Sequence, residues 1–227
     1  LKYKQYYCPE YGTFRPSLKD GTFLEPFNPR QGENFEPVPG FHEGSAWNYT
    51  FYVPHDIMGL AKLMGGRKAF VSKLQKVFDE GLYDPANEPD IAYAYLFSYF
   101  KGEEWRTQKT VHELLEKYYT TRPNGLPGND DTGTMSAWAI FSMMGFYPDC
   151  PGKAEYTLTS PRFDRIEIKL APEYCEGENK LVIKCSRTSG EGWKKIGSVK
   201  LSGKTLPSLR VSHKDLVKGG LLEFRCL

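Results

Sequence analysis

Residues 133–144 of the chain read GTMSAWAIFSMM, and most of these side chains are apolar. A helix with apolar residues on all of its faces is buried rather than half exposed. We therefore predict that this segment forms a helix that is buried on most sides. Two adjacent carboxylates, Asp130 and Asp131, stand immediately before it.

Upstream of this segment, apolar residues recur at the spacing of helices, and loops rich in Pro, Gly and Asn separate the runs. Glycines mark the ends of three of these runs. Asn87 is placed to cap one helix, with Glu88 and Pro89 in its first turn. The four helices predicted in this part of the chain cover residues 54–63, 67–80, 87–102 and 105–119.

After residue 152 the pattern changes to short runs that alternate as strands do. Turn signals at residues 176–177, 189–190 and 202–203 separate these runs. The net charge also changes, from −4 before this point to +6 after it. The predicted strands cover residues 156–158, 165–170, 181–185, 198–201 and 221–226.

These patterns predict a chain that is mainly α with a small β module. The helical domain covers residues 1–152, and an antiparallel β module covers residues 153–227. The chain opens with LKYKQYY, which lacks the apolar core of a signal peptide, so either the protein is cytosolic or a leader was removed before this sequence begins. A helix-like opening that runs straight into CPEYG at residues 8–12 is typical of the interior of a domain, so we expect a fragment of a longer protein.

The composition excludes several classes of protein. No run approaches about 20 consecutive apolar residues, so no transmembrane helix is expected. The net charge of +2 gives no electrostatic reason to expect a nucleic acid as partner. The five cysteines are scattered, with no CxxC pair and an odd total, which argues against a zinc site and against a full disulfide framework. A single disulfide bond within the C-terminal group of cysteines is compatible with this pattern.

Three polar clusters lie at helix starts or in loops. The first reads FHEGSAWNY over residues 41–49 and is followed by VPHD over residues 53–56. The second reads ANEP over residues 86–89, and the third reads GLPGNDDTG over residues 125–133. A glycine beside a carboxylate lets the backbone approach a ligand, and a neighbouring aromatic ring can raise the pKa of a carboxyl group by desolvation.

Each carboxylate also has a structural interpretation. Glu43 can be an ordinary loop residue, and Glu88 can be a first-turn residue favoured by the helix dipole. Asp131 or Thr132 can be a helix N-cap. The four histidines lack metal-ligand spacing. GxSxG, GxxxxGK and GxGxxG motifs are missing, so nucleophile-elbow and phosphate-loop chemistry have no support.

Taken in order, the clusters resemble glycoside hydrolase family 92, a family of calcium-dependent exo-α-mannosidases that act mostly on α-1,2 linkages. The segments SAW at residues 136–138 and GFYP at residues 145–148 extend the resemblance. Near the end of the chain, SPRFD at residues 160–164 and GGLLEF at residues 219–224 also fit. Several multi-residue motifs in one order make the resemblance specific.

The resemblance implies an architecture and a setting. The family has an N-terminal β-sandwich followed by an (α/α)6-barrel, and this chain resembles the C-terminal part, namely the later barrel helices and a closing antiparallel β segment. It implies a secreted, periplasmic or cell-surface protein. The expected partners are a mannose-containing glycan as substrate and the N-terminal β-sandwich domain of the same protein.

The resemblance also implies catalytic roles. Glu43, in the Glu-Gly-x-Ala-Trp segment, matches the general acid of an inverting glycosidase. Asp131 matches the general base, with Asp130 beside it as an assistant. Inversion requires the two carboxyl groups to lie roughly 6.5–9.5 Å apart, so that water fits between the base and the sugar.

Binding roles follow in the same way. Glu88 is the first candidate ligand for Ca²⁺ and Asn87 the second, since both offer the oxygen atoms that this cation requires. Trp47 and His55 match sugar-contact positions. Two other interpretations stay open: a non-catalytic fragment or sugar-binding module, and a different (α/α)6 glycosidase such as a trehalase-like hydrolase.

Overall fold

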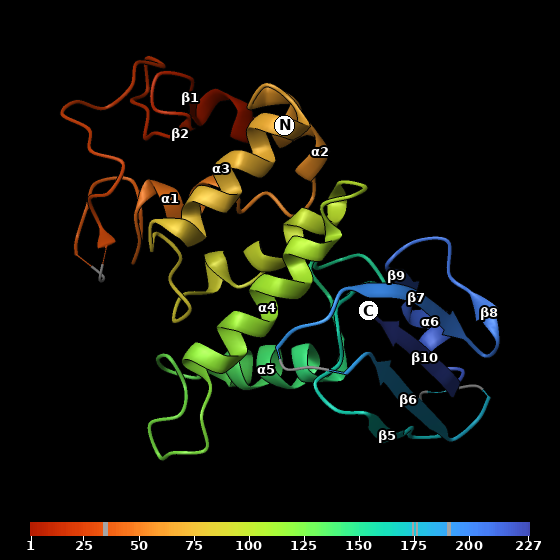
Figure 1. Ribbon diagram of the computed structural model, residues 1–227. Coiled ribbons are helices and arrows are strands. Elements are labelled where there is room, and N and C mark those ends of the chain that lie inside the picture. The colour runs from red at the N-terminus through yellow and green to blue at the C-terminus, as the bar shows by residue number, and fades with distance from the viewer. Residues whose placement is uncertain (34–35, 174, 176, 190–191) are drawn as a thin grey trace. The chain divides into compact units, whose positions relative to one another are not determined.

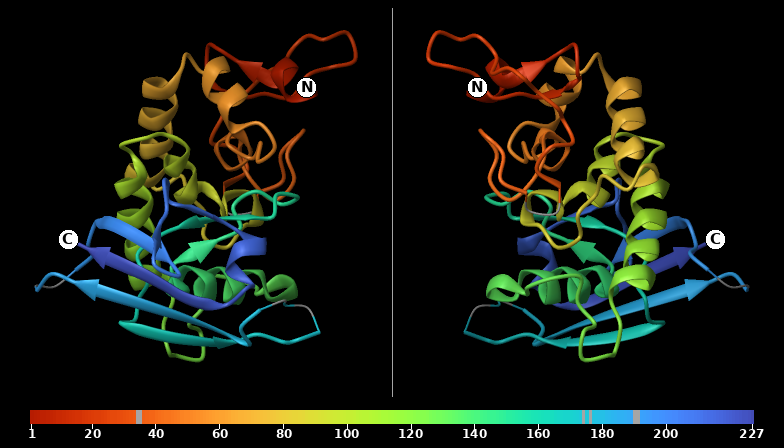
Figure 2. Two further views of the ribbon diagram at one scale, coloured as in Figure 1. Left: turned by 90° about the vertical axis from the view of Figure 1, so that its right-hand side faces the viewer. Right: turned by 90° about the vertical axis from the view of Figure 1, so that its left-hand side faces the viewer.

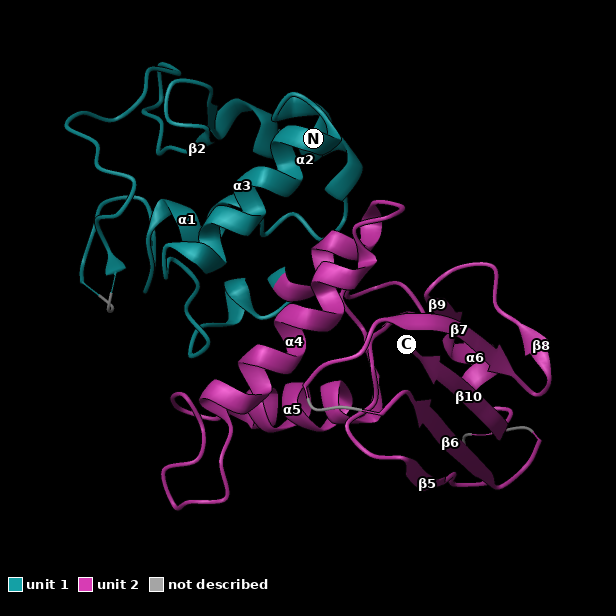
Figure 3. Ribbon diagram, in the orientation of Figure 1, with its two compact units in different colours: residues 1–93 teal, residues 94–227 magenta. Residues whose placement is uncertain are grey.

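The computed structural model describes residues 1–33, 36–173, 175, 177–189 and 192–227 (Figure 1). The chain divides into two compact units, unit 1 (Leu1–Tyr93) and unit 2 (Ala94–Leu227) (Figure 3). Among the helices that the structure describes, none combines the length and the apolar character needed to cross a membrane.

Unit 1 is a helical body preceded by a long, mostly irregular segment. Its elements are the 3₁₀ helix η1 (Lys2–Tyr6), the antiparallel strands β1 (Tyr7–Cys8) and β2 (Thr13–Phe14), the helices α1 (Ala46–Thr50), α2 (Ile57–Leu63) and α3 (Arg67–Asp79), and the 3₁₀ helix η3 (Glu88–Asp90). The two helices predicted over residues 54–63 and 67–80 are confirmed as α2 and α3. The short helix α1 was not predicted.

Aromatic rings fill the core of unit 1. The Phe51 ring meets Phe70 edge-on, with centroids 5.1 Å apart, and meets Tyr93 at 5.4 Å. All three side chains are almost completely buried. Such tilted pairs are the favoured arrangement of aromatic rings and stabilise beyond the area that they bury.

A buried cation organises the irregular segment of unit 1. The Arg15 guanidinium lies 5.1–5.5 Å from the ring centroids of Tyr11, Phe23 and Phe27, and it donates to the carbonyl of Leu24. Only 4% of the Arg15 side chain is exposed. Cation–π contacts gain strength when the cation is desolvated, so this arginine orders a stretch that has little regular structure of its own.

Unit 2 holds the remaining helices. They are the 3₁₀ helix η4 (Tyr93–Tyr99), which begins at the last residue of unit 1, then α4 (Glu104–Tyr118), the 3₁₀ turn η5 (Asp131–Gly133), α5 (Thr134–Met144) and α6 (His213–Leu216). The helices predicted over residues 105–119 and 133–144 are confirmed as α4 and α5.

The single helix predicted over residues 87–102 is wrong in type. The chain forms two separate 3₁₀ segments there, η3 and η4. The amides of Asp90 and Ile91 donate to the carbonyls three residues earlier, Asn87 and Glu88. The buried carboxylate of Asp90 accepts from the Asn48 side chain and the Asp84 amide, both outside this segment, so distant contacts rather than local hydrogen bonding decide the backbone here.

The strands of unit 2 form two sheets. β3 (Phe146–Tyr147), β4 (Glu155–Leu158) and β9 (Arg210–Ser212) form a three-stranded antiparallel sheet in that order. The second sheet has five strands in the order β5-β6-β10-β7-β8. Their bounds are β5 (Arg165–Lys169), β6 (Lys180–Arg187), β7 (Ile196–Leu201), β8 (Lys204–Thr205) and β10 (Gly220–Cys226).

The five predicted strands are confirmed as β4, β5, β6, β7 and β10. The expected purely antiparallel pairing is wrong at one place, because β6 and β10 run parallel (Figure 2). A parallel neighbour needs a long crossover, which the chain supplies through β7, β8, β9 and α6 between these two strands. The expected turn at residues 202–203 is confirmed between β7 and β8, whereas Glu176 and Gly190 of the other two turns lie outside the described residues.

The fold is therefore mixed helix and sheet rather than mainly α. Within unit 2, Phe141 and Met144 of α5 pack on the core formed by the inner faces of β6 and β10. The amide of Ile196 in β7 donates to the side chain of Gln108 in α4. Helices and strands thus share one body on both sides of residue 152, and a domain boundary at that residue stays a prediction.

Burial of α5 is partial within this chain. Trp138 and Met135 are almost fully buried, as predicted, but Ile140 on the opposite face is 56% exposed. The expectation of burial on most sides is met on one face only, and the other face presents apolar side chains.

A buried ion pair fastens the three-stranded sheet. The Arg210 guanidinium lies 3.7 Å from Asp149 and 2.9 Å from Glu155, and it stacks on the Tyr99 ring at 4.3 Å. Asp149 is 1% exposed and also accepts from the Thr157 hydroxyl. Loss of the arginine would leave a buried carboxylate without its cation.

We therefore expect Arg210→Met to reduce the free energy of unfolding by about 2–3 kcal/mol, somewhat below the range for a fully buried pair because the arginine is one-fifth exposed. Urea denaturation provides the measurement. Lys218→Met is the control, since its pair with Asp215 is half exposed and should change stability very little. Equal effects of the two substitutions would contradict the assignment.

Candidate functional site

The first polar cluster forms a tight turn that enters α1. Glu43 has φ +53°, a left-handed conformation that is uncommon outside glycine and asparagine. At the start of α1, the Ser45 amide and hydroxyl both donate to Oδ1 of Asn48, at 2.7 and 2.8 Å. The side chain at the third helical position thus fixes the helix start.

Asn48 is in turn held by a buried carboxylate. Its Nδ2 donates to Oδ2 of Asp90 at 2.9 Å, and the Asp84 amide donates to the same oxygen at 2.8 Å. Asp90 is completely buried, and this burial raises the pKa of its carboxyl group well above the ordinary value. Its Oδ1 has no partner among the described residues.

Asn87 joins the second cluster to the first. This side chain is buried, and its Nδ2 donates to the backbone carbonyl of Glu43. A Cβ atom at Gly44 would lie 3.2 Å from that nitrogen and 3.3 Å from Cβ of Asn48. A larger residue at position 44 would therefore push on the side chains of Asn87 and Asn48 by a few tenths of an ångström.

The Glu43 carboxylate points away from this buried network. Its side chain is 59% exposed and lies 3.6 Å from Nε2 of His42. A cavity of about 520 Å³ lies beside this turn. Its wall includes His42 and the rings of Phe41, Tyr49 and Tyr52, and the first two of these rings stack with centroids 5.6 Å apart.

The two expected sugar-contact residues differ in exposure. Trp47 is 6% exposed, and Lys73 and Lys76 lie over its ring at 5.1 and 5.3 Å. It is a core residue of unit 1. His55 is exposed, and its ring stands edge-on to Tyr3 at 5.9 Å.

Glu88 begins η3 and is exposed. Its carboxylate makes no hydrogen bond or ion pair with any residue that the structure describes. The side-chain nitrogen of the adjacent Asn87 donates to the Glu43 carbonyl, so the Oδ1 atom of Asn87 is the one that could ligate a cation. Across the described ranges, no three His, Cys, Asp or Glu side chains gather closely enough to hold a metal ion by themselves.

The third cluster lies in unit 2, at the start of α5. The Asp130 carboxylate accepts from the Ser136 amide at 2.8 Å and from the Ser136 hydroxyl at 2.6 Å. These hydrogen bonds, the hydroxyl bond foremost, lower the pKa of Asp130 below its ordinary value of 3.8. The capping role expected of Asp131 or Thr132 is wrong in residue: Gly133 occupies the N-cap position of α5, and Asp130 is the side chain that binds the first turn through Ser136.

Asp131 behaves differently from its neighbour. Its carbonyl accepts from the hydroxyl of Thr134 at 2.7 Å, and the next residue, Thr132, has φ +55°. The Asp131 carboxylate is exposed and makes no hydrogen bond or ion pair within the described part of the chain. One carboxylate of the pair holds the helix start, and the other is presented to solvent.

Sequence reasoning missed the supporting residues Asn48 and Asp90. The S-x-x-N spacing of Ser45 and Asn48 was the available signal, because a polar side chain three residues after an N-cap serine often closes the cap. No comparable local signal marks Asp90, whose partners lie 42 and 6 residues away.

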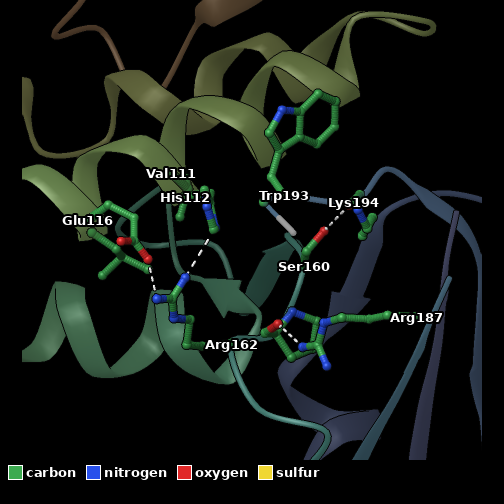
Figure 4. Close-up of a pocket in the computed structure, with 11 residues that line it drawn as sticks. Val111, His112, Glu116, Ser160, Arg162, Arg187, Trp193 and Lys194 are labelled. Carbon is green, nitrogen blue, oxygen red and sulfur yellow. Dashed lines mark hydrogen bonds and ion pairs between the residues drawn. The ribbon is translucent and has the colours of Figure 1, made fainter. Parts of the chain in front are cut away.

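A polar cavity of about 360 Å³ lies elsewhere in unit 2 (Figure 4). Arg162 pairs there with Glu116 and lies 3.3 Å from Nδ1 of His112. The Arg162 amide donates to the carbonyl of Met143, so this cavity adjoins the end of α5 opposite to Asp131. Because α5 is 11 residues long, about 16 Å separate the two ends.

Comparison with known proteins connects this geometry to a class of enzyme. Residues 1–226 match the family model of the glycosyl hydrolase family 92 catalytic domain. The match covers both compact units and all three polar clusters. The chain belongs to glycoside hydrolase family 92.

Individual relatives agree. An uncharacterized secreted glycosidase of Arthroderma benhamiae is 31% identical over 182 residues, which are 80% of this chain and 23% of that protein. The family GH92 α-mannosidase BT3965 of Bacteroides thetaiotaomicron, solved with mannoimidazole, superposes with a TM-score of 0.87 at 27% identity. The inverting mannosidase BT2199 of the same organism gives 0.83 at 28% identity.

The chain spans only a part of these relatives. It is covered to 99% by both solved structures, but it accounts for 31% of the BT3965 chain and 32% of the BT2199 chain. The activity of the whole protein is therefore a proposal.

The contrast between Asp130 and Asp131 leads to a test. We expect Asp130→Ala to lower the Tm at pH 7, whereas Asp131→Ala leaves it nearly unchanged. Since folding lowers the pKa of Asp130, its contribution is present above pH 3.8 and is lost as the pH falls through the folded-state value. Thermal denaturation at pH 7 and near pH 3 should show the Asp130→Ala deficit shrinking at the acidic pH. An equal deficit for Asp131→Ala would contradict these roles.

Proposed function

We propose that the protein is an exo-acting, inverting α-mannosidase that removes terminal α-1,2-linked mannose from glycans. This chain would supply the C-terminal part of its catalytic region, the later helices of an (α/α)6-barrel and a closing β segment. The solved relatives support this proposal, since one is an α-mannosidase and another an inverting mannosidase.

The observation that carries the proposal is backbone strain at both suspected catalytic turns. Among the described non-glycine residues, positive φ occurs at Glu43, at Thr132 and at Ser202 in the β7–β8 turn. The first two lie in the two clusters that bear the acid and base candidates. A left-handed non-glycine residue costs about 1–3 kcal/mol and persists where the surroundings impose it, typically at functional sites.

In this mechanism Glu43 is the general acid and Asp131 the general base. Glu43 would donate a proton to the glycosidic oxygen as the bond to the leaving sugar breaks. Asp131 would take a proton from a water molecule that attacks the anomeric carbon from the opposite face, which inverts its configuration. Both carboxylates are exposed and so are accessible to substrate.

Neighbouring residues would position these two groups. The bond from Asn87 to the Glu43 carbonyl holds the acid-bearing turn. Asp130 would assist by fixing the start of α5 through Ser136, so that the adjacent Asp131 is presented in one orientation. A group held in place before the reaction lowers the entropic cost of reaching the transition state.

Calcium would bind beside the acid. Glu88 and the Oδ1 atom of Asn87 fit a hard cation in chemical type, because both are oxygen donors. They fall short in number, since Ca²⁺ takes about 6–8 oxygen ligands, so water, the sugar and residues outside this chain would complete the set. When bound, the ion would supply positive charge that orients sugar hydroxyl groups.

The two residues expected to contact the sugar are assigned different roles because one side chain is exposed and the other is buried. His55 is exposed and would contact the glycan directly, together with the aromatic cavity beside His42. Trp47 is buried under two lysines and would act by supporting α1 behind Glu43. The remaining partner would be an N-terminal β-sandwich domain of the same protein.

We also propose a secreted, periplasmic or cell-surface location, which the description of the fungal relative as secreted supports. The competing functions are a sugar-binding module without catalysis and a different (α/α)6 glycosidase. The experiments below separate the three, because only an inverting α-mannosidase releases β-mannose from α-1,2-mannobiose.

The first experiment tests catalysis in the natural protein that carries this chain. NMR should detect β-mannose as the initial product from α-1,2-mannobiose. Glu43→Gln should lower kcat on this disaccharide about 10²–10⁴-fold, but on a mannoside with an activated leaving group the loss should be far smaller, since little protonation is needed.

Asp131→Asn is the matched variant. It should damage turnover of both substrates, because water must be activated whatever group leaves. Equal losses on the two substrates in Glu43→Gln would remove this residue from the acid role, and release of α-mannose would refute inversion.

The second experiment tests the metal. We expect chelation by EDTA to abolish activity of the natural protein and added calcium to restore it. Glu88→Ala should raise the calcium concentration needed for half-maximal activity, because it removes a charged ligand. Glu80→Ala, an exposed carboxylate at the end of α3, is the control and should leave that concentration unchanged. Full activity of Glu88→Ala in EDTA would reduce Glu88 to a first-turn helix residue worth about 0.3–1 kcal/mol.

A further inference from the structure

Two cysteines meet inside unit 2, at neighbouring strands of the five-stranded sheet. Cys185 lies on β6 and Cys226 on β10, and their Sγ atoms are 3.6 Å apart. Exposure of these residues is only 5% and 1%. Both side chains therefore face the core on the same side of the sheet.

The strand register explains why the two sulfur atoms approach. β6 and β10 are parallel, with Cys185 opposite Phe224 and Cys226 opposite Arg187. The cysteines are thus diagonal neighbours on one face, and side chains at such positions can touch across the strands. An irregularity in the pairing with β7 falls between Arg225 and Cys226, which gives Cys226 local freedom to adjust.

The surroundings polarise the pair. The two thiols are within hydrogen-bond distance and either can be the donor; this contact is the largest cause of the lowered pKa of Cys226. The Arg187 guanidinium acts on Cys226 in the same direction, whereas the Ser160 hydroxyl donates its proton to the Lys194 carbonyl. The pKa of Cys185 is raised, chiefly by this same bond. The Arg187 guanidinium favours a thiolate at Cys226, and the thiolate is the reactive form of a cysteine.

We propose that Cys185 and Cys226 form a disulfide that ties β6 to β10 when the protein meets a disulfide oxidant such as oxidised glutathione. The Cys226 thiolate attacks one sulfur of the oxidant, forms a mixed disulfide and releases one glutathione thiolate. The Cys185 thiolate then attacks the Cys226 sulfur and releases the second. The two cysteines lose two electrons and two protons, which pass to two glutathione thiols.

This bond would have a structural consequence. It would close a loop of 41 residues that contains β7, β8, β9 and α6, the whole crossover between the two parallel strands. Cross-links stabilise chiefly by restricting the unfolded chain, and more so for longer loops. The parallel β6–β10 pair joins segments far apart in the chain, so it is the pairing that gains most from such a constraint.

The proposal is independent of the proposed mannosidase function. It selects one pair from the five cysteines: Cys8 lies in unit 1, the Cys150 thiol donates to the Pro151 carbonyl, and Cys175 is a half-buried residue outside β6 and β10. A disulfide persists in an oxidising compartment, which agrees with the secreted character of the fungal relative.

Mass spectrometry provides the first test and needs no variant. The natural protein is equilibrated with oxidised glutathione under mildly denaturing conditions, remaining thiols are blocked with N-ethylmaleimide, and the peptides are analysed without reduction. We expect the peptides that contain Cys185 and Cys226 to appear as one species, lighter than their sum by two hydrogen atoms. Finding both cysteines alkylated, or bonded to other partners, would overturn the proposal.

Thermal stability provides the second test. Adding dithiothreitol to the oxidised protein should lower its Tm by about 5–10 °C, given a typical disulfide contribution and the size of the chain. The Tm of Cys226→Ala should not respond to dithiothreitol, whatever its absolute value. Cys150→Ala is the matched control and should keep the full response. A response of the same size in Cys226→Ala would assign it to another bond and refute the proposal.

Discussion

The hydrogen bond from the Asn87 side-chain amide to the Glu43 carbonyl is the contact on which the two polar turns of unit 1 depend. It joins two turns that are 44 residues apart in the chain, and it holds Glu43 in a left-handed conformation that the residue does not favour by itself. A second buried hydrogen bond, from the Asn48 side chain to the Asp90 carboxylate, supports the same pair of turns. Because the backbone carbonyl of Glu43 makes this structural hydrogen bond, the Glu43 carboxylate can face solvent.

In unit 2, a structural contact and an exposed carboxylate are divided between two adjacent residues. The Asp130 carboxylate accepts two hydrogen bonds from Ser136 and holds the start of α5, whereas the Asp131 carboxylate is exposed. The structural interpretation of an acidic pair before a helix therefore applies to Asp130, whereas the exposed Asp131 carboxylate fits the catalytic role that we propose for it. A charged group with no protein partner is costly to hold in one place, and the neighbouring cap provides that order.

Regular elements were predictable where the pattern was strong. The stripes of α3 and α4 and the alternation of β6 and β10 identified these elements within a few residues. Predictions failed where distant contacts outweighed local preference: residues 87–102 form two 3₁₀ segments around the buried Asp90, and α1 is set by the Ser45–Asn48 cap rather than by an apolar stripe. The parallel pairing of β6 and β10 was also missed, because strand direction depends on the crossover.

The sequence by itself determined the family and most helices and strands, since periodicity and short ordered motifs are local properties of the chain. Only the tertiary structure decided which member of each motif is buried and which is exposed. Trp47 became a core residue, Asp130 the side chain that binds the first turn of α5, and Asp131 an accessible carboxylate. It also selected Cys185 and Cys226 from five cysteines. The physical reason is that burial and pairing arise from contacts between residues tens of positions apart, which no local pattern encodes.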